Sequence, residues 1–187
     1  MRRLCIALAA LGLATLAEAQ VTMRDELRIM PDSLTPYLTE NNRLDCIDFL
    51  DSNMKAEVHN ALDGKSQLLT LTEHYAKFQL SEAHVMELRL LDTTVPVDSC
   101  RQVLCLVSTV GKDVQESTIS FYSVRWKPLS PHAYMSLPVG IFTAALDERE
   151  PQLTITSVNY LDCLAMEGQQ PLSAVPINLK WRNNSFK

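Results

Sequence analysis

The stretch QVLCLVSTVGKDVQESTISFYSVRW, residues 102–126, predicts two β-strands joined by a turn. Its first part, 102–110, is rich in Val, Leu and Cys and is typical of a strand. Gly-Lys-Asp at 111–113 forms the turn, and 117–126 alternates with the period of two that a strand requires. One face of the second strand would carry Ile119, Phe121 and Ser123, and the other Tyr122, Val124 and Trp126.

Similar runs on both sides of this hairpin predict a sheet of six or more strands. Strand-like residues run from 66 to 80 and again from 84 to 91. Further runs follow at 152–160 and 175–181, while 140–146 is ambiguous between helix and strand. Because short turns join successive strands, we expect a mainly antiparallel meander with one covered face and one solvated face.

One long helix is predicted ahead of the sheet. Its apolar residues recur at steps of three and four, the spacing of one helical face: Leu44, Ile47, Leu50, Met54 and Val58. Asp-Gly at 63–64 offers a stop. The predicted fold class is therefore α+β, with an N-terminal amphipathic helix packed on the antiparallel sheet.

Three aspartates, Asp45, Asp48 and Asp51, recur at steps of three within this helix. Asp51 stands four residues before Lys55, which is the favourable order for a surface ion pair. A calcium site would need oxygens from a loop that curls around the ion with the help of glycine, and this segment has no such loop. We therefore interpret the aspartates as the solvated side of the helix.

The N-terminal segment MRRLCIALAALGLATLAEAQ matches the pattern of an export signal. Arg2 and Arg3 precede an apolar run at 4–16, and small residues at 17 and 19 suit a signal peptidase, so cleavage is predicted before Gln20. The run is shorter than the about 20 residues that cross a bilayer, and no later segment is apolar enough to be a transmembrane helix. The alternative is a buried N-terminal helix. We expect an exported protein, in the periplasm or at the cell surface, that is soluble after signal cleavage.

Without the signal peptide at 1–19, residues 20–187 have the length of a single α+β domain. A proline-punctuated connection at 128–138 would separate two halves. ALD at 61 and LTLT at 69 are echoed by ALD at 145 and LTIT at 153, at a constant offset of 84 residues. The echo indicates two related halves, or it arises because LTLT is a common strand pattern.

The composition narrows the class of partner. The formal net charge is −5 and the chain has no basic stripe, so nucleic acid is not an expected partner. The hydrophobic fraction of 47% is enough to build a core.

Four cysteines remain after removal of the signal: Cys46, Cys100, Cys105 and Cys163. Their spacing contains no C-x2-C pair, so we predict no zinc or other metal site. An exported protein can form a disulfide, and both one bond and none stay open. If one forms, the predicted pair is Cys100–Cys105.

Catalytic signatures are missing from the sequence. It contains no G-x-S-x-G, no H-E-x-x-H and no glycine-rich phosphate loop, so no catalytic residue and no cofactor is predicted. A Cys–His pair that meets only in space stays open. The candidate ligand-binding residues are Tyr122, Trp126 and Trp181, because aromatic rings stack well and carry polar groups. Core packing is the alternative for all three, and it is the one that we favour.

Several motifs together resemble those of a known family. They are Met30-Pro31-Asp32-Ser33-Leu34, Arg43-x-Asp45-x-Ile47-Asp48, Ser117-x-Ile119-x-Phe121-Tyr122, Trp126-x-Pro128-Leu129, and Trp181 with Phe186. Over nearly the whole mature chain they resemble a family of small exported proteins of unknown function from anaerobic Gram-negative gut and oral bacteria. The family pattern tends to have Asp before the serine, where this chain has Glu116. The resemblance implies a location in the periplasm or at the cell surface, and it implies no activity, cofactor or catalytic residue.

The functional prediction is an exported, non-enzymatic binding module of the bacterial envelope, whose partner is an envelope protein or a glycan. It depends on the export signal, the missing catalytic signatures and the β-rich chain. One alternative is a small periplasmic hydrolase whose site is assembled from distant residues. Another is a purely structural envelope protein.

Overall fold

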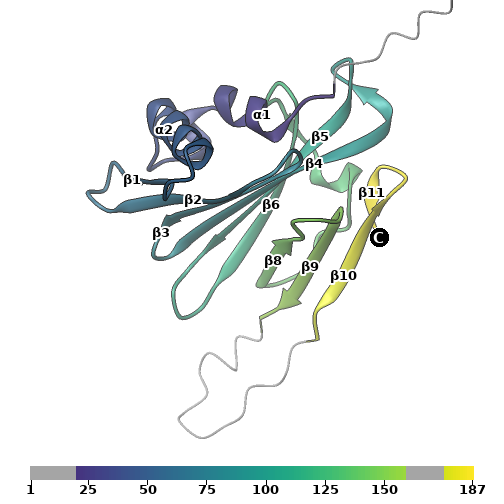
Figure 1. Ribbon diagram of the computed structural model, residues 1–187. Coiled ribbons are helices and arrows are strands. Elements are labelled where there is room, and N and C mark those ends of the chain that lie inside the picture. The colour runs from purple at the N-terminus through teal and green to yellow at the C-terminus, as the bar shows by residue number, and fades with distance from the viewer. Residues whose placement is uncertain (1–19, 159–174) are drawn as a thin grey trace, which may run out of the picture.

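The predicted meander is a seven-stranded antiparallel sheet whose strands lie side by side in chain order (Figure 1). Its strands are β1 (Glu57–His59), β2 (Lys65–Leu71), β3 (Tyr75–Ser81), β4 (His84–Val97), β5 (Cys100–Val110), β6 (Glu116–Ser123) and β7 (Pro128–Leu129). The computed structural model describes residues 20–158 and 175–187. Every neighbouring pair in this sheet is antiparallel and consecutive in the chain, so the meander prediction is confirmed.

A second antiparallel sheet has four strands in the order β11-β10-β9-β8. Its strands are β8 (Phe142–Leu146), β9 (Gln152–Ser157), β10 (Ile177–Arg182) and β11 (Ser185–Phe186). Asn183 and Asn184, with φ of 51° and 64°, form the two-residue turn between β10 and β11. The expectation of a single sheet therefore needs correction, because the last strand-like runs and the ambiguous segment 140–146 build a separate layer.

The run from 66 to 80 is two strands and not one. Residues 72–74 turn the chain between β2 and β3. The hydroxyl of Thr72 accepts a hydrogen bond of 3.1 Å from the backbone N–H of Tyr75, so a side chain closes this turn. Neither Gly nor Pro marks the site, which is why the sequence pattern missed it.

Two α-helices precede the sheets, α1 (Met23–Ile29) and α2 (Glu40–Asp51), and each begins with a threonine cap. The side chain of Thr22 accepts from the N–H of Asp25, and Thr39 forms a capping box with Asn42. Short 3-10 turns lie at η1 (Asp32–Leu34) and η2 (Pro131–Ala133). Both α-helices lie over the same side of the seven-stranded sheet (Figure 1).

The helix predicted to continue to residue 62 ends at Asp51, so this prediction was wrong beyond that point. Asn53 takes a left-handed conformation with φ of 54°, and Met54 is 52% exposed. The carbonyl of Ala56 then accepts a hydrogen bond of 2.9 Å from the backbone of Leu68. Pairing with β2 therefore replaces a continued helix. The apolar spacing beyond Asp51 was a coincidence of strand and turn residues.

Each face of the seven-stranded sheet carries a packed layer over its central strands, which corrects the expectation of one solvated face. The helices and one face share a core that includes Leu27, Ile47, Phe78, Leu88 and Leu104. The second sheet and the other face share a core that includes Cys105, Phe121, Leu153 and Ile155. The central strands β4 and β5 each carry a run of six buried residues, as expected for strands buried on both sides.

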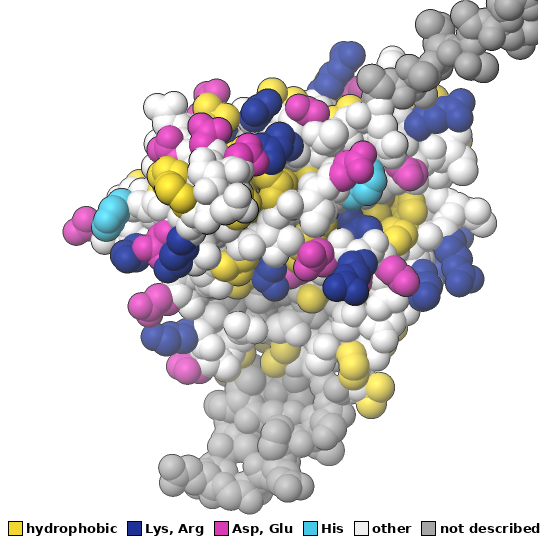
Figure 2. Space-filling view, viewed as in Figure 1, with side chains coloured by type: hydrophobic (Ala, Val, Ile, Leu, Met, Phe, Trp, Pro, Cys, Tyr) yellow, Lys and Arg dark blue, Asp and Glu magenta, His cyan; other side chains and the backbone are white. Residues whose placement is uncertain are grey.

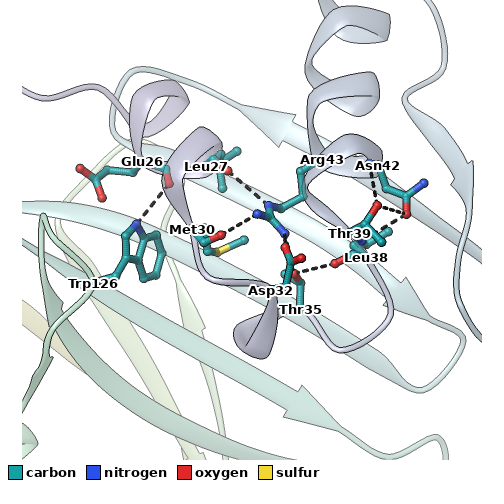
Figure 3. A network of polar contacts seen from close by, with 10 residues as sticks. All are labelled: Glu26, Leu27, Met30, Asp32, Thr35, Leu38, Thr39, Asn42, Arg43 and Trp126. Atoms are coloured by element: carbon teal, nitrogen blue, oxygen red, sulfur yellow. Dashed lines mark hydrogen bonds and ion pairs between the residues drawn. The ribbon is translucent and has the colours of Figure 1, made fainter.

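A buried arginine ties α2 to the segment before it (Figure 3). The Arg43 side chain is 2% exposed and donates to the carbonyls of Leu27 (3.3 Å) and Met30 (2.5 Å). It also donates to the hydroxyl of Thr35 (3.1 Å) and the carboxylate of Asp32 (2.6 Å). Because Arg43 stands among the buried residues of α2, with Cys46 and Ile47, the helix is less amphipathic than predicted.

The three aspartates of α2 point to solvent. Asp45, Asp48 and Asp51 are all exposed, in agreement with the interpretation of a solvated helix face. Asp51 does not pair with Lys55, because its two carboxylate oxygens accept from Arg24 of α1 at 2.6 Å each. Asp51 therefore helps to join the two helices at the surface, and the three aspartates are not among any group of possible metal ligands in the described residues.

The two echoed segments adopt different structures. Residues 61–63 lie in the turn after β1, whereas 145 and 146 end strand β8. The described parts before and after the connection at 128–138 also differ, since only the first contains α-helices. Among the residues that the structure describes, no helix has the length and apolar character needed to cross a bilayer.

We predict that Arg43→Ala lowers the free energy of unfolding by about 2–4 kcal/mol, because it leaves two carbonyls and a hydroxyl without their buried donor. Urea denaturation followed by tryptophan fluorescence measures this change. Arg24→Ala is the matched control, since its exposed pair with Asp51 contributes less than about 1 kcal/mol. Equal losses in the two variants would contradict a special role of Arg43.

Candidate functional site

The second sheet attaches to the first through the open edge of β8. The backbone N–H of Ala144 donates to the hydroxyl of Ser117 (2.8 Å), and the N–H of Leu146 donates to the carboxylate of Glu87 (2.8 Å). An edge strand exposes unpaired donors that would otherwise lie in a buried layer. Side chains of β4 and β6 therefore take the place of a neighbouring strand.

Glu87 is the centre of this junction. It is 5% exposed, and one carboxylate oxygen accepts from the hydroxyl of Tyr75 (3.1 Å) and the amine of Lys77 (2.8 Å). The other oxygen accepts from Leu146. Burial and the charge of Glu87 raise the pKa of Tyr75, so the phenol stays a donor. All partners of this buried carboxylate are thus donors, as a buried charge requires.

A second charged residue of β4 binds the turn that follows β8. Arg89 is 4% exposed and donates to the carbonyls of Asp147 (2.5 Å) and Arg149 (3.1 Å). The carboxylate of Asp147 accepts from the N–H groups of Glu150 and Arg149, which lowers the pKa of Asp147. Glu87 and Arg89 together hold β8 and its turn against the first sheet.

A cavity of about 250 Å³ lies in the corner between the two sheets, beside Glu87. We call it the corner pocket. It is lined by Lys77, Val85, Glu87, Thr109, Gln115, Thr143, Ala144, Ala145, Thr154 and Thr156. Four threonines and one glutamine form half of this lining, Lys77 and Glu87 are charged, and the other three residues are apolar; it includes no aromatic ring, cysteine or histidine. At this volume it suits a ligand smaller than the drug-sized molecules that fill about 300–1,000 Å³.

A second concavity of about 500 Å³ lies further along β3 and β2. We call it the β2–β3 hollow. It is lined by Glu57, Lys65, Ser66, Gln67, Gln79, Ser81, Glu82 and Lys112. Its charges are paired, Glu57 with Lys65 at 2.7 Å and Glu82 with Lys112 at 3.2 Å. Hydrogen bonds from Lys55 and Lys65 lower the pKa of Glu57 to about 2.

The predicted aromatic residues do not form one site. Tyr122 and Trp126 face the helices with ring centres 5.6 Å apart, and the Trp126 indole donates to the carbonyl of Glu26 (Figure 3). Trp181 lies on the other side of the sheet, where it stacks on Tyr134 at 6.0 Å. Ile119 and Phe121 lie on the side opposite Tyr122 and Trp126, as predicted, but the strand predicted over 117–126 ends at Ser123, and Trp126 lies after the turn with φ of 57°. The three rings take part in packing, as the favoured alternative expected.

The cysteines do not form the predicted bond. Cys46, Cys100 and Cys105 are free thiols, and Cys163 lies outside the described residues. Cys100 packs toward the helices and Cys105 toward the second sheet, because residues five apart on a strand face opposite ways. Burial raises the pKa of Cys46 to about 11 and also raises that of Cys105, so neither is an activated nucleophile.

A serine and a histidine meet on the helix side. Nε2 of His84 lies 2.8 Å from the hydroxyl of Ser108, and burial lowers the pKa of His84. Nδ1 of His84 is buried without a hydrogen-bond partner, so no carboxylate orients the ring. Across residues 20–158 and 175–187, no three His, Cys, Asp or Glu side chains gather as metal ligands would.

One buried carboxyl stands apart from the corner pocket. Glu26 of α1 is 1% exposed, and its Oε2 atom has no hydrogen-bond partner. Loss of solvation, with a smaller effect from Asp25, raises the pKa of Glu26 to about 8. Glu26 therefore stays protonated at neutral pH, and its backbone carbonyl, not its carboxyl, accepts from the Trp126 indole (Figure 3).

The two charged residues of the junction stand out in the sequence, because they interrupt an otherwise apolar strand. VMELRLL at 85–91 is apolar except for Glu87 and Arg89, whose charged side chains lie on one face of the strand. Charges in a doubly buried strand need buried partners, so their presence indicates a polar contact in the core. The threonines of the corner pocket come from three separate strands and gave no local signal.

A protein family described as "Protein of unknown function (DUF3256)" matches residues 17–169, which is more than half of the chain. The chain belongs to this family. The predicted resemblance to a family of unknown function is therefore confirmed as far as membership of such a family. No curated protein matches this DUF3256 member.

A solved structure from Porphyromonas gingivalis W83, of a domain of an uncharacterized protein, is similar with a TM-score of 0.74. The two sequences are 21% identical, and the similarity covers 90% of this chain and 98% of that one. At this identity the likeness shows that the DUF3256 chain shares the fold with that domain.

We predict that the folded protein loses stability as pH rises from about 5 to 8 because of Glu26. Its pKa is raised to about 8 from 4.5, so the folded state keeps a proton that the unfolded chain releases in this range. Glu26→Gln removes this dependence. The difference in the free energy of unfolding between the wild type and Glu26→Gln should therefore change by about 2–4 kcal/mol from pH 5 to pH 8. Urea denaturation at several pH values measures it.

The exposed Glu148→Gln variant serves as the control for Glu26→Gln and should follow the wild type at every pH. Parallel curves for the wild type and Glu26→Gln would show that Glu26 titrates normally in the folded protein.

Proposed function

We propose that this protein is an exported, non-enzymatic binding module of the bacterial envelope, with the corner pocket as its ligand site. The observation that carries the proposal is a cavity of about 250 Å³ whose polar lining is held by the buried Glu87 junction. The partner would be an envelope glycan or protein that presents a small polar group.

The corner pocket suits recognition. Its threonine hydroxyls each donate and accept, and they project from β5, β8 and β9, which are rigid strands. Lys77 is held in place by Glu87, so little ordering is needed when a ligand arrives. The lining offers no Cys, His or Ser nucleophile, which favours binding over reaction.

A hydrolase is the second candidate, and the contact of 2.8 Å between His84 and Ser108 favours it. The pair lies on the helix side, away from the corner pocket. It has no acid on Nδ1 of His84, and a catalytic base normally needs such an orienting group. Binding in the corner pocket is therefore the stronger proposal. A purely structural role would leave both sites without a ligand.

Export rests on the N-terminal pattern at 1–19 and on the resemblance to exported proteins. When the full chain is expressed in a Gram-negative host, we expect a periplasmic product whose first residue is Gln20. N-terminal sequencing of the fractionated cells checks this. Ala19→Trp places a bulky residue at the cleavage site and should leave the signal attached. A cytoplasmic, uncut wild-type chain would refute export.

We predict that a small neutral sugar or amide binds at the corner pocket, and that Thr156→Val weakens binding about fivefold. The loss equals one hydrogen bond of about 1 kcal/mol, since valine keeps the shape and removes the hydroxyl. NMR titration of residues 20–187 with glucose, N-acetylglucosamine and acetamide should move the signals of Thr143, Thr154 and Thr156.

Thr118→Val is the matched control for Thr156→Val, because Thr118 is an exposed threonine of β6 outside both concavities. Equal weakening in the two variants, or signals that move mainly around His84, would count against the corner pocket.

A further inference from the structure

The strand register places one row of side chains across six strands, on the face opposite the helices. The row is Glu57, Gln67, Gln79, Val85, Thr109 and Ser117, in the order β1 to β6. Each member is the direct partner of the next, and all but Val85 are polar. We call this set the polar row. Ser117 is buried under β8, whereas the other five members are partly exposed, so the row leaves the covered part of this face and continues over a part that the second sheet does not cover.

The polar row runs from one concavity to the other, since Gln79 of the β2–β3 hollow pairs directly with Val85 of the corner pocket, and we call the two together the groove. Its β6 end lies under β8, where Ser117 accepts from Ala144. Its middle, Val85 and Thr109, lines the corner pocket, and its β1 end, from Gln79 to Glu57, lines the β2–β3 hollow. Neighbouring strands are about 4.8 Å apart, so β4 to β1 spans about 14 Å. A ligand that fills the groove is longer than one that fills the corner pocket.

The charges along this groove cancel. Each of its three acids lies within ion-pair distance of a lysine: Glu87 of Lys77, Glu57 of Lys65, and Glu82 of Lys112. Acidic and basic side chains are also interspersed over the visible surface (Figure 2). A charged ligand would have to break these pairs and would gain little from the field of the groove. A neutral ligand avoids both costs.

The groove also disfavours a peptide. A peptide can bind a sheet by adding a strand to a free edge, but at the β8 edge beside the corner pocket the N–H groups of Ala144 and Leu146 already donate to Ser117 and Glu87. Apolar pockets for peptide side chains are missing, since Val85 and two alanines are the apolar residues in the lining. What remains is a neutral surface of hydroxyl, amide and paired ionic groups, which matches a ligand made of hydroxyls.

We propose that the groove binds an uncharged oligosaccharide, with one ring in the corner pocket and the following rings over Gln79 and Gln67 in the β2–β3 hollow. The proposal rests on the proposed function, because it extends the same site. Recognition is through hydrogen bonds to the polar row, and the aromatic residues of the two cores take no part.

The test is calorimetric titration of residues 20–187 with malto-, cello- and N-acetylchito-oligosaccharides of one to four rings. We expect the affinity in one of these series to rise at least about tenfold from one ring to three. Gln67→Ala should remove this gain and leave the binding of one ring unchanged, whereas Thr156→Val should weaken both. Gln152→Ala, outside the groove, is the matched control. Affinity should change little with salt.

The outcomes separate this inference from the proposed function. If one ring and three rings bind with equal affinity, the extended groove is refuted and the corner pocket stands. If a neutral triglycine binds and no sugar does, the oligosaccharide is refuted and the site stands. Tighter binding of charged oligogalacturonate would refute the neutral ligand. If none of these probes binds, the inference and the proposed function both fail.

Discussion

The buried carboxylate of Glu87 is the contact on which the two-sheet arrangement depends. It accepts from Tyr75 and Lys77 of its own sheet and from the backbone of Leu146 in the other. Apolar packing is not directional, so it would let β8 slide over the first sheet. A hydrogen bond from one particular N–H does not allow this. Glu87 therefore sets the position of the second sheet, and a buried charge of this kind is costly when any partner is lost.

On the helix side a buried charged residue also positions the covering layer, but here it is an arginine and not a carboxylate. Arg43 is buried against α1 and η1, and it satisfies two carbonyls that the C-terminal end of α1 leaves free (Figure 3). Helix α1 has only seven residues and is too short to be stable alone, so its place depends on such tertiary contacts. On each side of the first sheet, buried ionic residues thus orient the layer that covers it: Arg43 on the helix side, and Glu87 with Arg89 on the other.

The groove is a consequence of unequal layers. A sheet of seven strands is wider than the four-stranded sheet that packs on it, so the second layer leaves the β1–β3 side open. The junction that holds the sheets also supplies Glu87 and Lys77 to the corner pocket. Stability and recognition therefore share residues here. Loss of Glu87 would damage the fold first, which makes the threonines and glutamines better probes of binding.

The sequence by itself determined much of the local structure of this protein: the hairpin of β5 and β6, the antiparallel order of the first sheet and the opposite sides taken by Phe121 and Tyr122 follow from periodicity and turn residues. The tertiary structure decided the rest. Residues 52–62 continue a helical spacing, yet they form a turn and β1 because pairing with β2 satisfies their backbone. The split into two sheets, the roles of Glu87 and Arg43, and the polar row depend on which strands become neighbours. Such contacts join residues far apart in the chain, and no local pattern records them.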